Sequence, residues 1–435
     1  MEYVLTMTSN KLGVEKLLLS TFLFMLIFNP PLIRGIDFIK VSAAIALVYI
    51  TFNYKRFEVF LSKPKVKSSL SIFVIYILYG LGVNTVWALI RSTDPEHSNL
   101  NMSEGISLIT TYLLLFVPVI AVCLYTEKNR IDFLGVVECL LIAFSCQAFL
   151  VIIAFISPDI KKNFVDLIYQ NSSNSYIAKI VQGSSTRRVY GLASNLWDHF
   201  GGSCAIMFGV CACLFQQGYN KRIINAALIV FMVYLNSRTA LLTCIVLLGI
   251  TICYQFKNSF SVETIIKLLM SFVFCYIAFQ VISNSISGTT SDWVSDAFDN
   301  IKMFFSDSRE ESSLNSYFND FVFFHDNYIT VIFGQGLRPR DIIGKNSDIG
   351  YVEIIWRYGV IGSILLYVSY FNLMRKARSD NKMYNQIVLY ILIVLVLFHM
   401  KINILGVNST TIVANLVLFS LLSYNSDNEK ELQKT

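Results

Sequence analysis

Charged side chains at the start of an apolar segment near the C-terminus are the residues of this chain best suited to chemistry. The stretch SDIGYVEIIWRYGVIG (Ser347–Gly362) places Asp348, Glu353 and Arg357 where a long apolar run begins. A charge at bilayer depth costs about 3 kcal/mol or more, so it is rarely there without a partner or a role. A carboxylate there can orient a hydroxyl group or accept its proton. We therefore consider Asp348 and Glu353 candidate catalytic residues.

Arginines supply a second kind of chemistry. A guanidinium fork matches phosphate oxygens in bidentate geometry, so several such groups together suit a diphosphate. The alternative for each arginine is a pairing with lipid head groups or loop carboxylates. Arg238 occupies a minimal turn between two apolar runs, where a functional role is favoured over that alternative. The candidate diphosphate-binding residues are Arg187, Arg188, Arg238, Arg309 and Arg338.

Other polar residues near the same apolar runs are candidates for contacts with an acceptor or with a cavity wall. Glu353 and Arg357 are four residues apart, a spacing that favours an ion pair on one helix face, and that pair could be purely structural. For Asp198 and His199 a hydrogen bond between helices is the alternative to a place in a cavity. An imidazole titrates near neutral pH, which would suit a base. The candidates are Asp198, His199, His325, Arg340, Tyr351 and Arg357.

The composition determines the class of protein that must position these residues. The chain is 55% hydrophobic and 15% charged, with a mean hydropathy of +0.58, whereas a soluble protein carries roughly 25% charged residues. A helix that crosses a bilayer needs about 20 mostly apolar residues. We therefore expect an all-α polytopic membrane protein that forms one integral domain over residues 1–435. No P-loop, metal-ligand pattern or cofactor motif is evident, and all nine cysteines fall in apolar runs, where packing is their expected role.

Twelve membrane spans and two long loops follow from the apolar pattern. Basic residues cluster in alternate short connections, such as 53–67 and 375–382, which places both termini in the cytoplasm. The connection 91–105 and the two long loops, 158–193 and 284–348, then lie outside. Periodic aromatic residues predict amphipathic helices in the second loop, at 291–305 and 314–333. The predicted spans are 17–33, 36–52, 68–90, 106–125, 133–157, 194–216, 223–236, 239–256, 262–283, 349–374, 385–402 and 409–425.

Four short segments occur in the order found in one enzyme superfamily. They are RRVYGLASN (187–195), NSRTALL (236–242), SREESSLNSYFNDF with FGQGL (308–337), and SDIGYVEIIWRYGVIG (347–362). By these segments the chain resembles the bacterial O-antigen polymerases of the Wzy type, within the O-antigen polymerase and ligase superfamily. The resemblance implies a glycosyltransferase of lipopolysaccharide biosynthesis in the inner membrane, with a periplasmic active site and no metal or cofactor.

The implied substrates are undecaprenyl-diphosphate-linked oligosaccharides, one as donor and one as acceptor. Arginines would stabilise the leaving diphosphate, Asp348 or Glu353 would act on the acceptor hydroxyl, and the product would be inverted. The bilayer is a further partner, a chain-length regulator protein fits beside the enzyme, and no nucleic acid is expected.

Three alternatives differ in class or partner. A ligase of the same superfamily has a histidine at the place held here by Asp348, counting back from Gly359 and Gly362. That difference favours the polymerase. A flippase for lipid-linked oligosaccharides would also use cations and many spans, but it would not need a long structured exported loop. A chain-length scaffold usually has two spans and a large periplasmic domain, unlike this chain.

Overall fold

The computed structural model describes residues 2–171, 188–194, 197–258, 322–324, 327–344, 347, 349–403 and 405–432. Its described regular elements are all helices. Six helices, α4, α5, α6, α9, α17 and α18, are long and apolar enough to cross a membrane, as expected of a membrane-embedded protein. The helices are α1 (Glu2–Phe28), α2 (Phe38–Phe52), α3 (Tyr54–Ser62), α4 (Pro64–Ile90), α5 (Pro95–Asn129), α6 (Phe133–Ile156), α7 (Pro158–Asn171), α9 (Trp197–Gln216), α10 (Arg222–Asn236), α11 (Arg238–Asn258), α15 (Tyr328–Phe333), α16 (Pro339–Ile343), α17 (Gly350–Ala377), α18 (Lys382–His399) and α19 (Ser409–Leu432).

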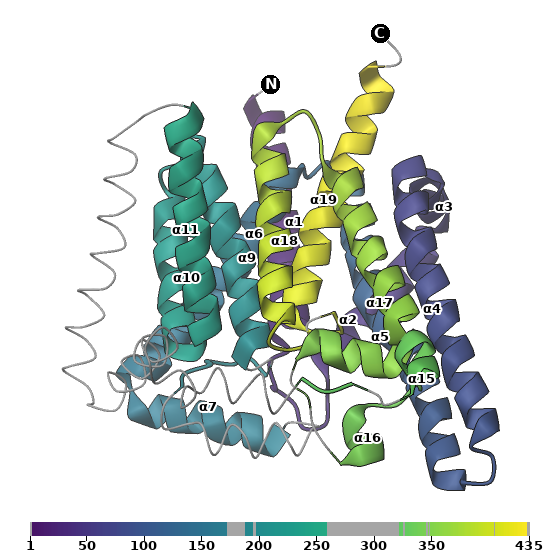
Figure 1. The fold of residues 1–435 in the computed structure, drawn as a ribbon. Coiled ribbons are helices and arrows are strands. Elements are labelled where there is room, and N and C mark those ends of the chain that lie inside the picture. Colours follow the sequence, from purple (N-terminus) through teal and green to yellow (C-terminus); the bar gives the residue numbers. More distant parts are fainter. Residues whose placement is uncertain are drawn as a thin grey trace.

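A helix lies over each predicted span except 262–283, which falls outside the described residues. The number of twelve spans therefore stays a prediction. The start of α1 and the end of α19 lie on the same face of the bundle, and the short helices α7, α15 and α16 lie at the opposite end (Figure 1).

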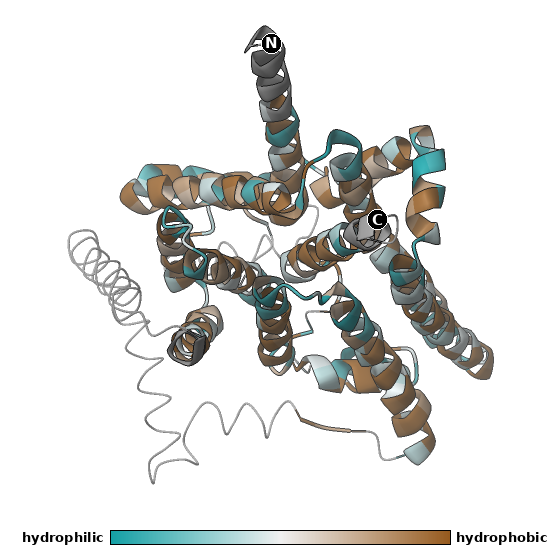
Figure 2. Ribbon diagram, turned by 90° about the horizontal axis from the view of Figure 1, so that it is seen from above, coloured by the Kyte–Doolittle hydropathy of each residue, from teal (hydrophilic) through white to brown (hydrophobic). Residues whose placement is uncertain are grey.

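Figure 2 shows apolar residues along most of the bundle helices. Large apolar side chains such as Phe52, which is 85% exposed, also face outward. Such surfaces match a hydrocarbon environment.

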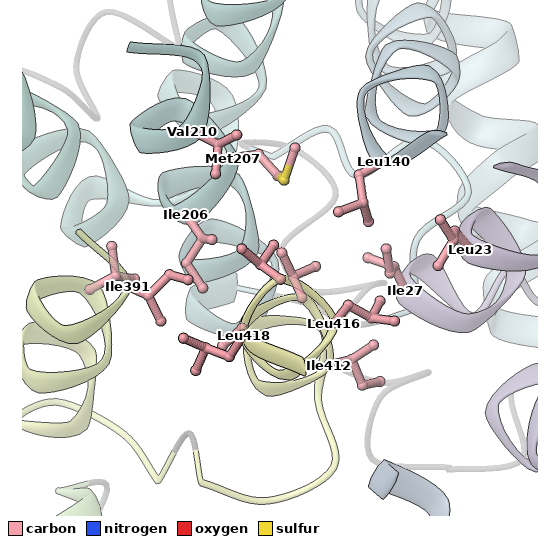
Figure 3. Close-up of a cluster of buried hydrophobic side chains, with 14 of the residues drawn as sticks. Leu23, Ile27, Leu140, Ile206, Met207, Val210, Ile391, Ile412, Leu416 and Leu418 are labelled. Carbon is pink, nitrogen blue, oxygen red and sulfur yellow. The ribbon is translucent and has the colours of Figure 1, made fainter. Parts of the chain in front are cut away.

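Helix α19 forms the centre of the hydrophobic core. Its side chains from Ile412 to Leu422 are almost all inaccessible, as expected of a helix that is apolar on every face and surrounded by other helices. Figure 3 shows Ile412, Leu416 and Leu418 of α19 between neighbouring helices. The neighbouring side chains come from α1, α6, α9 and α18: Leu23, Ile27, Leu140, Ile206, Met207, Val210 and Ile391.

The predicted connection 91–105 is largely helical, so this prediction was wrong. Helix α5 begins at Pro95, because Asp94 caps it by accepting a hydrogen bond from the backbone N–H of His97 and Pro95 occupies its first turn. The His97 imidazole also contacts the Asp94 carboxylate at 2.6 Å. These hydrogen bonds lower the pKa of Asp94 below its usual value. The longer α5 brings Asn101 and Glu104 onto a helix that packs against α4.

The two long loops contain helices of their own. The first begins with α7, whose end is fixed by a hydrogen bond of 3.0 Å from Asn171 Nδ2 to the Pro31 carbonyl. In the second, the predicted helix 291–305 lies outside the described residues. Of the predicted helix 314–333, only α15 is helical among the described residues, while 322–324 are not. Trp356 anchors that segment, since its indole donates to the Phe323 carbonyl at 2.9 Å.

Helix α17 is broken at Gly359, where the backbone has φ 66° and ψ −174°. The first segment lies across the end of the bundle and the second runs through it (Figure 1). A residue with a side chain rarely adopts a positive φ, so the glycine permits this break. The predicted span 349–374 is therefore two helical segments, and Glu353 and Arg357 belong to the first.

Candidate functional site

Two glycines bring the segment FGQGL against the break in α17. A side-chain atom on Gly334 would lie 2.5 Å from the Arg357 carbonyl, and one on Gly359 would overlap the Ile332 carbonyl. Both residues also have a positive φ. Only glycine allows two backbones to approach this closely in these conformations. We refer to this contact of residues 332–336 with 356–359 as the glycine seam.

The glycine seam uses the carbonyl groups that the break releases. The backbone N–H groups of Gln335 and Gly336 donate to the carbonyls of Trp356 and Arg357, at 3.2 and 2.8 Å. The Tyr79 hydroxyl donates to the Tyr358 carbonyl at 3.2 Å. Broken helices persist at membrane depth only where such groups find partners.

Helices α4 and α5 hold the other side of the FGQGL segment. The Trp87 indole donates to the Gly334 carbonyl at 2.8 Å, and Asn101 Nδ2 donates to the Gln335 carbonyl at 3.0 Å. Arg91 bridges Asn101 Oδ1 and Gln335 Oε1, at 2.8 and 3.0 Å. Helices α4 and α5 and the FGQGL segment are thereby fixed around the break in α17.

Four charged side chains next to the seam form a network that we call the acidic cluster. Arg357 pairs with Glu104 of α5 and lies 3.7 Å from Glu353, its neighbour one turn away. This confirms the predicted pair of Glu353 and Arg357. Arg338, at the start of α16, lies 3.7 Å from each of the same two carboxylates. The two arginines and two carboxylates balance in charge, and the Arg357 and glutamate side chains are less than one-fifth exposed.

A second group of polar residues surrounds the start of α9, and we call it the cationic cluster. The Asp198 carboxylate accepts from Ser237 Oγ at 2.9 Å and lies 3.1 Å from Lys401 Nζ. Lys401 also donates to Thr239 Oγ1 at 2.8 Å. Arg238 stands between Ser237 and Thr239 in the sequence, at the first position of α11. The cluster comprises Asp198, Ser237, Arg238, Thr239 and Lys401, so among these described residues two carry a positive charge and one a negative charge.

Three helices begin at the cationic cluster. Their ends can approach one another closely because consecutive glycines leave the first turns of α9 without side chains. A side-chain atom on Gly201 would lie 2.6 Å from Ser237 Cβ, and one on Gly202 would overlap Thr410. The backbone carbonyl of His199 accepts from the hydroxyl of Thr410 at 2.7 Å. The positive ends of the dipoles of α9, α11 and α19 thus meet here, which adds to the cationic character.

The segment that contains Arg188 is fixed beside the cationic cluster. Asn236, which directly precedes Ser237, accepts from the Val189 N–H at 3.1 Å and donates to the Val189 carbonyl at 2.7 Å. Arg188 donates to the Tyr190 hydroxyl at 3.1 Å. The first two of the four sequence segments therefore meet, as the third and fourth do at the glycine seam.

The connection between α18 and α19 lies between the cationic cluster and the start of α17. Lys401 in this connection reaches the cationic cluster. His399, at the end of α18, packs instead against α17. The Nε2 atom of His399 lies 3.0 Å from the Tyr367 hydroxyl of α17. A side-chain atom on Gly350 would overlap the His399 ring, so the start of α17 is also packed here.

An apolar groove of about 370 Å³ begins at this junction and follows α17 and α18 into the bundle. Tyr351 and His399 line its outer end, while Met374 and Leu392 line it further along the two helices. Of the predicted cavity residues that the structure describes, only Tyr351 lies in this groove. Its lining is mainly aliphatic and aromatic, which suits a hydrocarbon chain.

The structure divides the predicted site residues into two groups and leaves some outside both. Glu353, Arg357 and Arg338 belong to the acidic cluster, whereas Asp198 and Arg238 belong to the cationic cluster, with Arg188 and His199 beside it. The side chain of Arg340 is 62% exposed and contacts only its neighbour Asp341, at 3.6 Å, among its described ion pairs. The remaining predicted residues lie outside the described residues: Arg187, Arg309, His325 and Asp348.

Sequence reasoning missed Lys401 and Glu104 as site residues. Lys401 lies in KINILGVNST, on the side where the same reasoning found unusual arginines, so the same signal would have identified it. Glu104 was assigned to a short polar loop and carried no signal there. Its role depends on α5 continuing as a helix through residues 95–105.

No group of three residues suited to hold a metal ion occurs within the described ranges. The chain was also compared with known proteins. No protein family, no curated protein and no solved structure shows a match to it.

Proposed function

We propose that this protein is an O-antigen polymerase, a glycosyltransferase that joins oligosaccharide repeat units carried on undecaprenyl diphosphate at the outer face of the bacterial inner membrane. The observation that most strongly supports this proposal is that the four sequence segments contact one another in two pairs. Segments one and two meet through Asn236 and Val189, and segments three and four meet at the glycine seam. The α18–α19 connection joins the two pairs on one end of the bundle.

The donor diphosphate is assigned to the cationic cluster. Among the described residues, Arg238 and Lys401 bring two cations to the cluster beside the Asp198 carboxylate, and Arg188 lies on the adjoining segment. Three helix N-termini add their dipoles. Such groups stabilise the negative charge that develops on the diphosphate as its bond to the sugar breaks. The charges of Arg338 and Arg357 are balanced by carboxylates, so we place these arginines with the acceptor instead.

The acceptor sugar is assigned to the acidic cluster and the adjoining start of α17. Its hydroxyl oxygen would attack the anomeric carbon of the donor as the bond to the diphosphate breaks. Glu353 or Asp348 would accept the hydroxyl proton, and undecaprenyl diphosphate would leave. Attack opposite the leaving group would invert the anomeric centre. The apolar groove between α17 and α18 is suited to the polyprenyl chain of one substrate.

Deleting the gene in its host and separating lipopolysaccharide on a gel tests the proposal. We expect core carrying a single repeat unit, with the long ladder lost, because flipping and ligation continue. Bare core with lipid-linked polymer would instead indicate a ligase, and bare core with trapped single units a flippase. Either result would overturn the proposal.

Complementation then tests the assigned site. Wild-type protein and Arg378→Ala should restore the ladder, because Arg378 lies beyond the end of α17 on the opposite face. Arg238→Ala should not restore it at equal expression. Full-length polymer from Arg238→Ala would refute the role of the cationic cluster while leaving the polymerase activity standing.

A further inference from the structure

We propose that a groove between α6 and α10 binds a zwitterionic glycerophospholipid, with the lipid phosphate on Arg222 and the lipid ammonium on Glu138. The groove lies toward the end of the bundle where α1 begins and α19 ends, away from both clusters. It has a volume of about 590 Å³ and opens on the outer surface of the described bundle. The proposal does not depend on the polymerase activity.

One face of α6 forms the floor of the groove. The lining residues recur at intervals of three and four positions, which places them on a single helix face: Glu138, Leu141, Ile142, Ser145, Cys146, Phe149 and Leu150. The twelve steps of helical rise from Glu138 to Leu150 extend about 18 Å. One leaflet of the hydrocarbon core is about 15 Å thick. The groove therefore matches the length of a single-leaflet lipid, which is much shorter than a polyprenyl chain.

Both charges of a zwitterionic head group have a counterpart at one end of the groove. Glu138 Oε1 lies 3.1 Å from Arg222 Nη2, and Glu138 Oε2 lies 2.8 Å from Lys16 Nζ of α1. The Glu138 side chain is 41% exposed and that of Arg222 is 21% exposed, so each can accept a further contact from the groove. Lys16 holds the carboxylate in place. A guanidinium binds a phosphate as a fork, and the carboxylate binds an ammonium group.

Polarity falls along the groove in the order of a phospholipid's own groups. One turn beyond Arg222, Asn225 Nδ2 donates to Ser145 Oγ at 3.0 Å, which places an amide and a hydroxyl at the depth of ester carbonyls. Beyond them Phe149, 63% exposed, and Leu150 form an apolar wall. The lipid head group would therefore lie at the charged end of the groove, its esters at the amide and hydroxyl, and its hydrocarbon chain on the apolar wall.

Native mass spectrometry of the purified full-length protein in detergent tests the proposal, with phosphatidylethanolamine and phosphatidylglycerol as probes. We expect wild-type protein to retain one phosphatidylethanolamine, about tenfold more tightly than phosphatidylglycerol. Arg222→Gln should weaken this retention about tenfold, because it removes one charge-assisted contact. Arg56→Gln, an exposed arginine on α3 outside the groove, should leave it unchanged.

A second variant tests the groove without changing a charge. Ile142→Trp fills the middle of the groove at a side chain that is 42% exposed, so it should fold normally and still lose the lipid. Equal retention by wild type, Arg222→Gln and Ile142→Trp would overturn the proposal. A clear preference for phosphatidylglycerol would also overturn it, because the assigned role of Glu138 would then be wrong.

Discussion

Lys401, in the connection between α18 and α19, joins three segments of the chain through its ammonium group, since it contacts Asp198 of α9 and Thr239 of α11. We predict that Lys401→Ala reduces polymer about tenfold or more, because a charge-assisted contact contributes about 1.5–3 kcal/mol. Ladder intensity in the complemented deletion strain measures this. Lys382→Ala, at the opposite end of α18, is the matched control and should restore the full ladder. If Lys401→Ala does so too, Lys401 has no part in the site.

Arg357 is the residue on which the stability of the acidic cluster depends most. Its side chain is 11% exposed and pairs with Glu104 and Glu353. We predict that Arg357→Met destabilises the protein by on the order of 3 kcal/mol, since two nearly buried carboxylates would lose a partner. Thermal unfolding in detergent measures this, and Arg375→Met, at the far end of α17, should change little.

A double variant separates electrostatics from packing in the acidic cluster. Glu104→Gln in the Arg357→Met background should recover part of the lost stability, because it removes one of the unpaired charges. If the two substitutions simply add, the carboxylate and the guanidinium do not stabilise each other.

At the scale of elements, the break in α17 depends on Gly359, which has a positive φ and packs closely against the backbone of a neighbouring segment. We predict that Gly359→Ala abolishes the ladder and lowers the unfolding temperature, because a side chain at φ 66° would be strained and would overlap Ile332. Gly82→Ala in α4 is the control. Its added methyl group meets nothing within 4 Å, so it should be neutral or stabilise by up to about 1 kcal/mol. Equal behaviour of the two variants would contradict the glycine seam.

At the scale of the whole molecule, both clusters lie at one end of the bundle and the termini at the other. If the clusters face the periplasm, Ser92→Cys and Asn327→Cys should react with an impermeant maleimide in intact cells. Ser62→Cys and Asp380→Cys, exposed at the opposite end, should react only after the membrane is permeabilised. The reverse pattern would invert the orientation and remove the active site from the periplasm.

Much of the helical order could be predicted from the sequence because apolar runs of about 20 residues have few stable structures other than a helix in a membrane. The pair Glu353 and Arg357 was also predictable, since it depends only on helical spacing. The start of α5 was not, because a cap at Asp94 and Pro95 extends the helix through polar residues that resemble a loop. The break at Gly359 was missed as well, since a glycine inside an apolar run gives no sign of its φ.

By itself the sequence determined the class of protein, the approximate positions of most described helices and the presence of unusual cations beside particular spans. Those properties depend on composition and on local spacing. Only the tertiary structure decided which charges share a cluster. Glu104 and Arg357 pair although 253 positions separate them, and Lys401 of the α18–α19 connection pairs with Asp198 of α9. Such pairings depend on how helices pack, which is governed by glycines at close contacts such as Gly201, Gly334 and Gly359 rather than by any local pattern.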